Sequence, residues 1–466
     1  MTMTQVLNDR FTVGQWRFGI VFALVLGFAV AACAEDDPTW RAGVAKVKVT
    51  PEDAMWMSGY GPRLAKSELH DLWVKVLVLE AADWTRGVII TSDVCGFSKQ
   101  SYDGICAALE KRCGLDRAAV RLTCSHTHTG PALRECLHVC WPWDDEEARR
   151  LVEKYSVDLE AKIVETVADA LTKMAPVTLF AGEGRADFAV NRRNNPEAEV
   201  TRLRESGAGL RGPVDHSVPL LAVRAADGEL RAVVFGYACH CTTISLSEWS
   251  GDFAGFAMLE LERQHPNLQA MFFQGCGADQ NPLPRKTVEL CQKYGHQLAA
   301  GVESALQKPL RPLSPQLRTA FEFTELEFKR PLTEDFLREQ ANQESVQGRL
   351  AARHLQQLQA GQPLPKSHSY AVQVWKLGQQ QLWVSLSGEV VVDYSLTYKA
   401  KYGPHTWVNG FAHDLVCYIP SARILREGGG QEVGVPWSYG LPALEWADDI
   451  EDRIHAGVGR LVDRVK

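Results

Sequence analysis

The alternation of short apolar runs with longer amphipathic segments restricts the fold more than any other feature of this sequence. Strand-length apolar runs lie at residues 72–79, 87–91, 118–124, 220–223 and 268–273. Amphipathic segments of helical length lie at residues 99–113, 146–173, 253–264 and 288–306. The run LWVKVLVL at 72–79 is apolar nearly throughout, which is typical of a strand buried on both faces. This alternation predicts an α/β protein in which mixed β-sheets are layered with helices.

The size and composition fit one large domain. The chain has 466 residues, of which 45% are hydrophobic, so it can bury a large core. Its net charge of −7 gives no reason to expect nucleic acid as a partner, which would favour a basic face. Residues 360–369 are the stretch most like a linker. The sequence nevertheless shows no internal repeat and no clear domain boundary. We therefore expect a single domain over residues 40–466.

The first 33 residues have the pattern of a signal peptide. Arg10 and Arg17 precede an apolar run at 18–32 that is too short for a comfortable membrane span. The run ends in Val-Ala-Ala-Cys, which resembles a bacterial lipobox and would leave Cys33 lipidated, although plain cleavage after Ala31 is the alternative. We expect export to the periplasm or cell envelope, with an anchor on Cys33 if the lipobox is used.

Two histidine motifs follow predicted strands. His126 and His128 lie in SHTHTGP, directly after the strand predicted at 118–124. In an extended chain, residues two apart share a face, so both rings are expected to point into one cavity. His240 lies near the end of the strand predicted at 231–241, on the face opposite Cys239 and Cys241. Either the imidazole or the two thiols can therefore face a site, but not all three.

The other cysteines carry little information on function. Eleven cysteines follow Cys33 and none forms a CxxC pair, so a cysteine-based zinc site is not expected. Two readings of these cysteines stay open: in an exported protein some can pair as disulfides, whereas in apolar contexts such as Tyr237-Ala238-Cys239 a thiol acts as a small core residue.

Six short motifs occur in an order that resembles the neutral/alkaline, non-lysosomal ceramidase family. These enzymes are zinc amidases that cut the N-acyl bond of ceramide. The resemblance extends from about Gly43 to about Tyr418 and concerns the catalytic N-terminal domain of the family, of which this chain would be a divergent member. The motifs are HTHTGP at 126–131, NR at 191–192, CHCT at 239–242 with SGD at 250–252, ADQNP at 278–282, SGE at 387–389 and YIPS at 418–421.

The resemblance implies a zinc site and its surroundings. Carried over by motif, the zinc ligands are His126, His240, Glu389 and Tyr418. His128 would lie beside the metal, and Arg192 would face the substrate. Histidines and a carboxylate are donors that suit zinc.

Two departures from the family concern the substrate. Asn281 stands where the family has a serine with a catalytic role, and an amide cannot act as a nucleophile. The family's C-terminal β-sandwich has no room in the 48 residues after Tyr418, so none is expected here. His128, Arg192, Asn281 and Tyr418 remain the candidate catalytic residues, for proton transfer, oxyanion stabilisation and hydrogen bonding to substrate.

These observations predict an exported zinc-dependent amidase that uses a metal-activated water. The expected partner is a small-molecule or lipid N-acyl substrate, either a ceramide-like lipid or a related N-acyl compound, and membrane contact would come through the N-terminal anchor. One alternative is a zinc hydrolase of another ester or amide, and a second is an exported zinc-binding module without catalysis.

Overall fold

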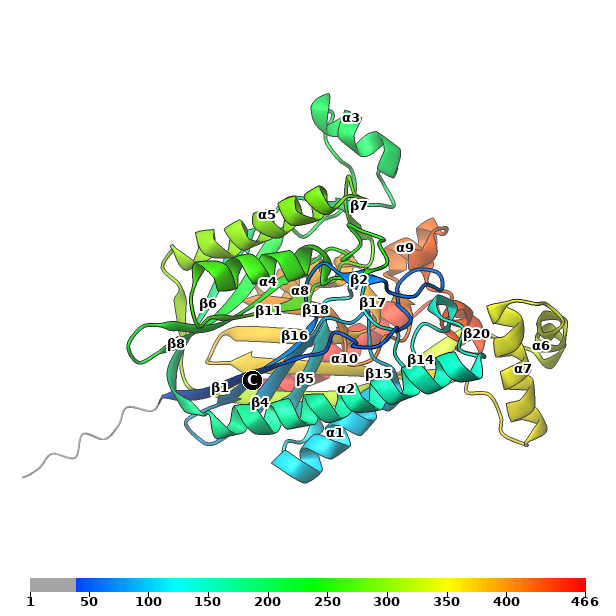
Figure 1. Ribbon diagram of the computed structural model, residues 1–466, viewed down its shortest axis with the longest axis horizontal. Helices are drawn as coiled ribbons and strands as arrows, with labels where there is room; N and C mark the ends of the chain where they lie inside the picture. Colours follow the sequence, from blue (N-terminus) through cyan, green and yellow to red (C-terminus); the bar gives the residue numbers. More distant parts are fainter. Residues whose placement is uncertain (1–38) are drawn as a thin grey trace, which may run out of the picture. The chain divides into compact units, whose positions relative to one another are not determined.

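A mixed β-sheet of fourteen strands runs through the part of the chain that the computed structural model describes, residues 39–466 (Figure 1). Neighbouring strands follow the order β11 (Gln269–Gln274), β9 (Leu230–Tyr237), β8 (Ser217–Ala225), β6 (Ala175–Arg185), β1 (Trp40–Lys48), β3 (Trp73–Glu80), β4 (Arg86–Ser92), β5 (Val120–Cys124), β18 (Thr406–Ala412), β16 (Gln381–Ser387), β15 (Ser367–Leu377), β14 (Leu317–Pro331) and β20 (Ala443–Trp446). β13 (Arg311–Leu313) pairs with β6. The pairs β11–β9, β4–β5 and β16–β18 are parallel and the others are antiparallel.

The sheet curls so that its first strand meets its middle. β11 packs against β5 and β18, and an isolated bridge joins Gly275, just after β11, to Asn409 of β18. The enclosed space is filled by large apolar side chains such as Leu77, Trp375 and Trp383. The rings of Phe273 and Trp383 lie 5.0 Å apart across this core. The two halves of the sheet are therefore held together by a shared apolar interior.

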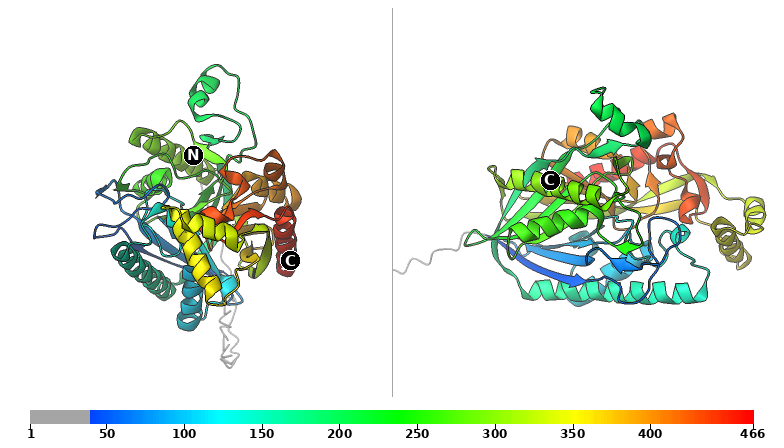
Figure 2. Two further views of the ribbon diagram at one scale, coloured as in Figure 1. Left: turned by 90° about the vertical axis from the view of Figure 1, so that its right-hand side faces the viewer. Right: turned by 45° about the horizontal axis from the view of Figure 1, so that its top comes forward.

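Helices cover the outer faces of the curled sheet (Figure 2). α1 (Lys99–Cys113) and α2 (Glu146–Thr172) pack over β1, β3 and β4, whereas α4 (Asp252–Gln264) and α5 (Val288–Leu306) pack over β11, β8 and β6. α8 (Val392–Tyr402) lies against β18, and α10 (Ile450–Val465) lies against β14 and β15. α6 (Glu334–Ala341) and α7 (Val346–Gln359) form a helical hairpin, and the remaining helices, α3 (Val200–Glu205) and α9 (Ala422–Glu427), are short. This layered α/β arrangement confirms the predicted fold class.

Strand periodicity explains the layers. On β3, Val74, Val76 and Val78 belong to the core beneath α1 and α2, while Leu77 and Leu79 point into the interior of the curled sheet. Successive side chains of a strand point to opposite faces, so a strand with apolar cores on both faces must be apolar throughout. The continuous apolar run at 72–79 has this origin.

Local signals fix the helix ends. The hydroxyl of Ser98 accepts a hydrogen bond from the Ser101 backbone and begins α1, and Gly114 ends it with a φ of 67°. Both α1 and α5 have the bounds that the sequence predicts. The strand predicted at 231–241 is too long, because β9 ends at Tyr237 and the chain turns before His240.

The described residues form one compact unit, and the expected linker at 360–369 runs directly into β15. Within residues 39–466, no helix combines the length and the apolar character needed to cross a membrane. The eleven cysteines of this part are all free and ten are buried, which confirms the reading of these thiols as small core side chains and not the disulfide alternative. The predicted signal peptide, residues 1–33, lies outside the described residues.

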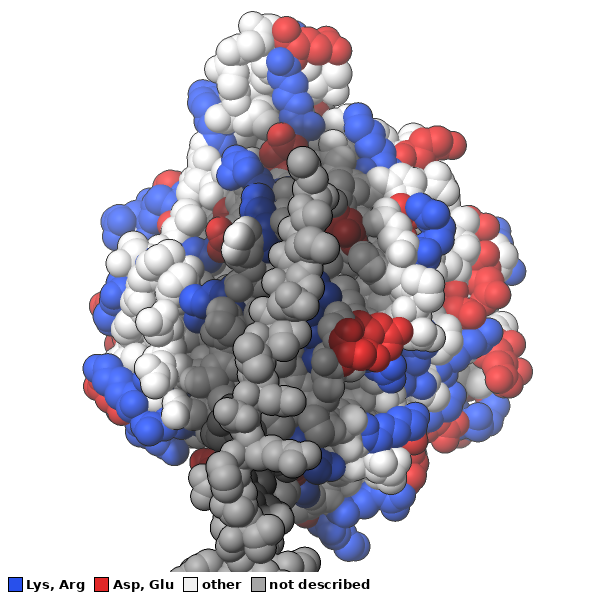
Figure 3. All heavy atoms as spheres, turned by 90° about the vertical axis from the view of Figure 1, so that its left-hand side faces the viewer, with Lys and Arg blue, Asp and Glu red and all other residues white. Residues whose placement is uncertain are grey.

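The surface seen in Figure 3 carries lysine and arginine side chains interspersed with aspartate and glutamate. No extended area of one charge sign is visible among the described residues on that face.

A close approach of β6 to α5 yields a stability prediction. A Cβ atom on Gly184 would lie 2.0 Å from the backbone oxygen of Gly301, a separation that neither backbone can accommodate without moving. We expect Gly184→Ala to lower the free energy of unfolding by about 1–3 kcal/mol, measured by denaturant titration. Gly104→Ala on α1 is the control, because its Cβ would make only an ordinary contact at 3.6 Å and alanine favours a helix. Equal stability of both variants would contradict this packing.

Candidate metal centre

The loops that follow several strands converge beside the region where the curled sheet closes. The loops after β5, β9 and β16 carry His126, His240 and Glu389. β5 and β18 pair only at their carboxyl ends, at Thr123 and Ala412, which brings the loop after β5 close to the loop after β16. Two small ladders complete the region: β7 (Ala189–Asn191) with β12 (Gln280–Pro282), and β17 (Glu389–Val390) with β19 (Tyr418–Ile419).

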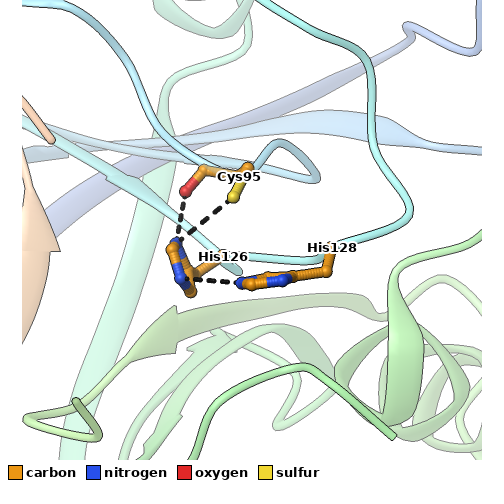
Figure 4. A group of neighbouring side chains, drawn as sticks. All are labelled: Cys95, His126 and His128. Carbon is orange, nitrogen blue, oxygen red and sulfur yellow. Dashed lines mark hydrogen bonds between the residues drawn. The ribbon is translucent and has the colours of Figure 1, made fainter. Parts of the chain in front are cut away.

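His126 is held by a backbone carbonyl. Its Nδ1 lies 2.6 Å from the oxygen of Cys95, which can only accept, so Nδ1 carries the proton and Nε2 has a free lone pair (Figure 4). The side chain is 1% exposed. The chain is not extended here, because His126 has a φ of 55°. His126 and His128 do face each other, but the extended-strand explanation is wrong: a left-handed residue turns the chain.

His240 repeats this arrangement. Its Nδ1 lies 2.7 Å from the oxygen of Gly277, in the glycine-rich turn after β11, so in the neutral ring the proton is on Nδ1 and Nε2 has a free lone pair. Its backbone N–H donates to Gln280 at 3.0 Å. Cys239 and Cys241 are buried in the core beneath α4 and α5. The imidazole of His240 therefore faces the site, and the two thiols do not.

Glu389 brings the carboxylate to these two nitrogens. Its Oε2 lies 3.2 Å from Nε2 of His240 and 3.7 Å from Nε2 of His126. Neither Nε2 can donate when the ring is neutral, because the proton is on Nδ1 in both rings. Two lone pairs and an anionic oxygen therefore face one point from three sides, in a region shielded from water. A cation is the natural occupant of such a point, and the donor set fits zinc.

The ionisation of these groups supports the same conclusion. Burial lowers the pKa of His126 to about 4, so the ring is neutral near pH 7. Burial alone would raise the pKa of Glu389, but the neighbouring histidines and a hydrogen bond from Tyr439 outweigh it and hold the pKa at about 2. Near neutral pH the cluster therefore offers the neutral imidazole of His126 and the carboxylate of Glu389, the protonation states that metal binding requires of these two groups.

A second group that could hold a metal, Cys95 with His126 and His128, shares His126 (Figure 4). Cys95 Sγ lies 3.6 Å from Nδ1 of His126, but that nitrogen already donates to the carbonyl of Cys95. His128 approaches the other edge of the same ring. Burial also raises the pKa of the Cys95 thiol well above its ordinary value, which disfavours the thiolate. The group of His126, His240 and Glu389 is therefore the better metal site.

His128 lies beside this site. Its Nε2 is 3.1 Å from Nε2 of His126, and its Nδ1 is buried with no hydrogen-bond partner among the described residues. Burial lowers its pKa well below the ordinary value, so the ring is neutral at pH 7. An unpartnered ring nitrogen next to a metal site is available to accept or hold a proton.

Arg192 connects the other predicted residues. Its Nη2 donates to the Tyr418 hydroxyl at 3.1 Å, its Nη1 donates to Oδ1 of Asn281 at 3.2 Å, and its Nε donates to Glu432 at 2.6 Å. Tyr418 is in register with Glu389 in the β17–β19 ladder, so both side chains leave the same side. The guanidinium is held rigidly by these contacts.

All seven residues predicted from the sequence line one cavity of about 1280 Å³, and they are His126, His128, Arg192, His240, Asn281, Glu389 and Tyr418. Their roles remain predictions.

Sequence reasoning missed two neighbours of this set. Tyr439 donates its hydroxyl to Oε1 of Glu389, and Glu432 forms an ion pair with Arg192. They lie in or next to two 3₁₀ turns, Gln431–Val433 and Pro436–Tyr439, that pack against the site from the C-terminal region. No spacing or motif in the sequence marks them, because neither turn follows a strand that the sequence indicates.

Asp252 has a supporting position. Its carboxylate accepts backbone N–H groups of Ile244 and Phe253 at 3.1 and 2.7 Å, and it is fully buried. It therefore fixes the loop after His240 at the start of α4 without contacting the imidazole.

The fold is one already seen in solved ceramidase structures. The chain is similar to the neutral ceramidase from Pseudomonas aeruginosa, with a TM-score of 0.67 and 18% identity, over 91% of this chain and 75% of that one. A second solved structure, a ceramidase complexed with C2, has a TM-score of 0.68 and 18% identity, over 91% and 76%. No model of a known protein family matches, and no curated protein matches by sequence. The resemblance seen in the motifs is thus confirmed at the level of the fold, with the low identity of a divergent chain.

Tyr439 provides a test of the site. Tyr439→Phe removes the hydrogen bond to Glu389, which then loses its orientation and one partner. We expect the affinity for zinc to fall about 10–100-fold, as is usual when a partner of a metal ligand is removed, measured by competition with a chromogenic chelator. Tyr402→Phe is the matched control, because the Tyr402 hydroxyl has no partner in the described structure. Unchanged affinity in Tyr439→Phe would show that Glu389 does not bind the metal.

Proposed function

We propose that this protein is a zinc-dependent amidase that hydrolyses an N-acyl bond in a ceramide-like lipid or a related N-acyl compound. The observation that carries the proposal is the convergence of Nε2 of His126, Nε2 of His240 and Oε2 of Glu389, each held by a further hydrogen bond. The fold shared with ceramidases favours an amide as the bond that is cut. The oxygen of Tyr418, in register with Glu389, is the candidate for a fourth ligand.

Zinc bound by these residues would supply a water of lowered pKa and polarise the substrate carbonyl. Arg192 and Tyr418 lie together at the edge of the site and both can donate to an oxygen that becomes negative during attack. The ion pair with Glu432 holds the guanidinium in place, so little reorganisation is needed when the charge develops. His128, with its unpartnered Nδ1, is the residue placed to carry a proton to the leaving amine.

The side chain at position 281 favours a mechanism in which water attacks the substrate directly. A mechanism with a covalent intermediate on Asn281 is disfavoured. Its Oδ1 accepts from Arg192, which leaves the amide N–H₂ free to donate to the substrate. A side-chain amide has no proton to lose near neutral pH and cannot become acylated as a serine can. The position therefore serves hydrogen bonding, and the reaction depends on the metal site alone for its nucleophile.

Metal content tests the proposal. We expect purified protein to bind one zinc per chain and to lose at least nine-tenths of it in His240→Ala, because one of three converging donors is gone. Inductively coupled plasma mass spectrometry measures the metal, and hydrolysis of an N-acyl substrate should fall with it. His405→Ala is the control, since His405 is exposed and outside the cavity. Equal zinc in wild type and His240→Ala would overturn the assignment.

We further propose that the protein is exported and anchored through Cys33. The support is the lipobox-like sequence Val-Ala-Ala-Cys at the end of the apolar run at 18–32. Such an anchor would keep the enzyme at a membrane surface, where lipid substrates lie.

Expression of the full chain in a bacterial host tests the anchor. Wild type should fractionate with membranes and carry an acylated Cys33 as its first residue by mass spectrometry. Cys33→Ala should be released from the membrane, whereas Cys113→Ala, which changes a partly exposed cysteine of the folded domain, should not. A mature chain that begins at Ala32 without lipid would contradict the anchor and leave export itself supported.

A further inference from the structure

The charged side chains that line the cavity balance one another only when no cation is bound. Three guanidinium groups, of Arg192, Arg193 and Arg285, face three carboxylates, of Glu197, Glu389 and Glu432. Glu389 belongs to the metal cluster, so a divalent cation there makes the cavity positive. A confined space with excess positive charge favours an anionic guest, because a cleft in the protein focuses the field of its charges.

Arg63 adds to this imbalance. It lies behind the cavity wall, where it donates to the backbone oxygen of His128 and packs 5.0 Å from the centre of the Tyr60 ring. It makes no ion pair with any carboxylate in the described structure, and its Nη1 is buried without a partner. Its positive charge is therefore not compensated and acts on the neighbouring cavity.

One wall of the cavity presents hydrogen-bond donors. Arg285 uses Nε and Nη2 for Glu197, at 3.0 and 2.8 Å, and its Nη1 makes only a long contact of 3.5 Å with the Thr242 oxygen. The Thr242 hydroxyl is buried and has no partner in the described structure. Asn281 keeps its amide N–H₂ free, as described above. These three donors lie on connected segments, because Lys286 N–H binds the Thr243 oxygen at 2.6 Å and His240 N–H binds Gln280.

We propose that this wall binds a carboxylate of the substrate, so that the N-acyl compound is an anionic amide, such as an N-acylated amino acid, and not a neutral ceramide. The inference rests on the proposed metal-dependent amidase and names its substrate class. Arg285 and Asn281 would determine specificity through charge-assisted hydrogen bonds, which bind more strongly than neutral ones. The acyl group would contact the aliphatic side chains that line the cavity, Leu137, Val139, Leu283 and Val435.

Matched substrates test the proposal on the zinc-loaded full-length protein. N-lauroylglycine carries a carboxylate on the amine side of the amide, N-dodecylsuccinamic acid carries one on the acyl side, and N-lauroylethanolamine is neutral. We expect kcat/KM for at least one acid to exceed that for the neutral amide by about tenfold to a hundredfold, the range of a charged hydrogen bond. The preferred acid identifies the side on which the carboxylate lies. Equal or faster cleavage of the neutral amide, or of ceramide, would overturn the proposal.

Substitutions locate the subsite. Arg285→Gln should reduce the ratio of acid to neutral turnover to about threefold or less. Lys286→Gln is the matched control, because it removes the same charge from the adjacent residue, whose side chain is 70% exposed and lies outside the cavity lining. A ratio that falls equally in both variants would show long-range charge alone and would overturn the assignment to this wall.

A binding measurement distinguishes an error in the proposed carboxylate subsite from an error in the proposed amidase activity. Isothermal titration calorimetry with the same three compounds needs no turnover. Preferential binding of an acid that is lost in Arg285→Gln, without hydrolysis of any amide, would support the carboxylate subsite and refute the amidase. Hydrolysis without any preference for an acid would support the amidase and refute the subsite.

Discussion

Two hydrogen bonds hold the centre of this structure, from Nδ1 of His126 to the oxygen of Cys95 and from Nδ1 of His240 to the oxygen of Gly277. Each fixes the tautomer of a buried imidazole and directs its Nε2 lone pair toward Glu389. Without them, the rings could donate to the carboxylate and close the cluster as an ordinary polar network. With them, both neutral rings would turn a lone pair toward the carboxylate, an arrangement that could hold a cation.

The curled sheet supplies the two carbonyls. Cys95 follows β4 and Gly277 follows β11, strands that lie far apart in the order of the sheet. They come together because the sheet folds back on itself and its interior is filled with large apolar side chains. The geometry of the candidate site therefore depends on the packing of a core in which no site residue takes part.

The metal cluster and the rest of the cavity bear on different parts of the function. The cluster concerns the reaction, and the cavity walls concern the substrate. The cluster of His126, His240 and Glu389 could hold a metal ion. The cavity walls carry Asn281 and Arg285, with Arg63 behind them, and the proposal of an anionic substrate rests on these residues. Because a fold alone does not fix a function, the cavity must be tested separately from the metal cluster.

The sequence by itself determined the α/β class, the ends of α1 and α5, and the motifs that carry His126, His240 and Glu389, because capping residues, strand periodicity and short motifs are local signals. It misplaced the end of β9 and gave the wrong reason for the pairing of His126 with His128, since left-handed residues and turns are set by contacts distant in sequence. Only the tertiary structure decided that the thiols of Cys239 and Cys241 face a core, that Tyr439 and Glu432 support the site, and that Arg63 makes no ion pair with a carboxylate among the described residues. Those facts depend on chain segments that are separated in sequence but meet in space, such as Arg192 and Glu432, which lie 240 residues apart, and no local pattern encodes that meeting.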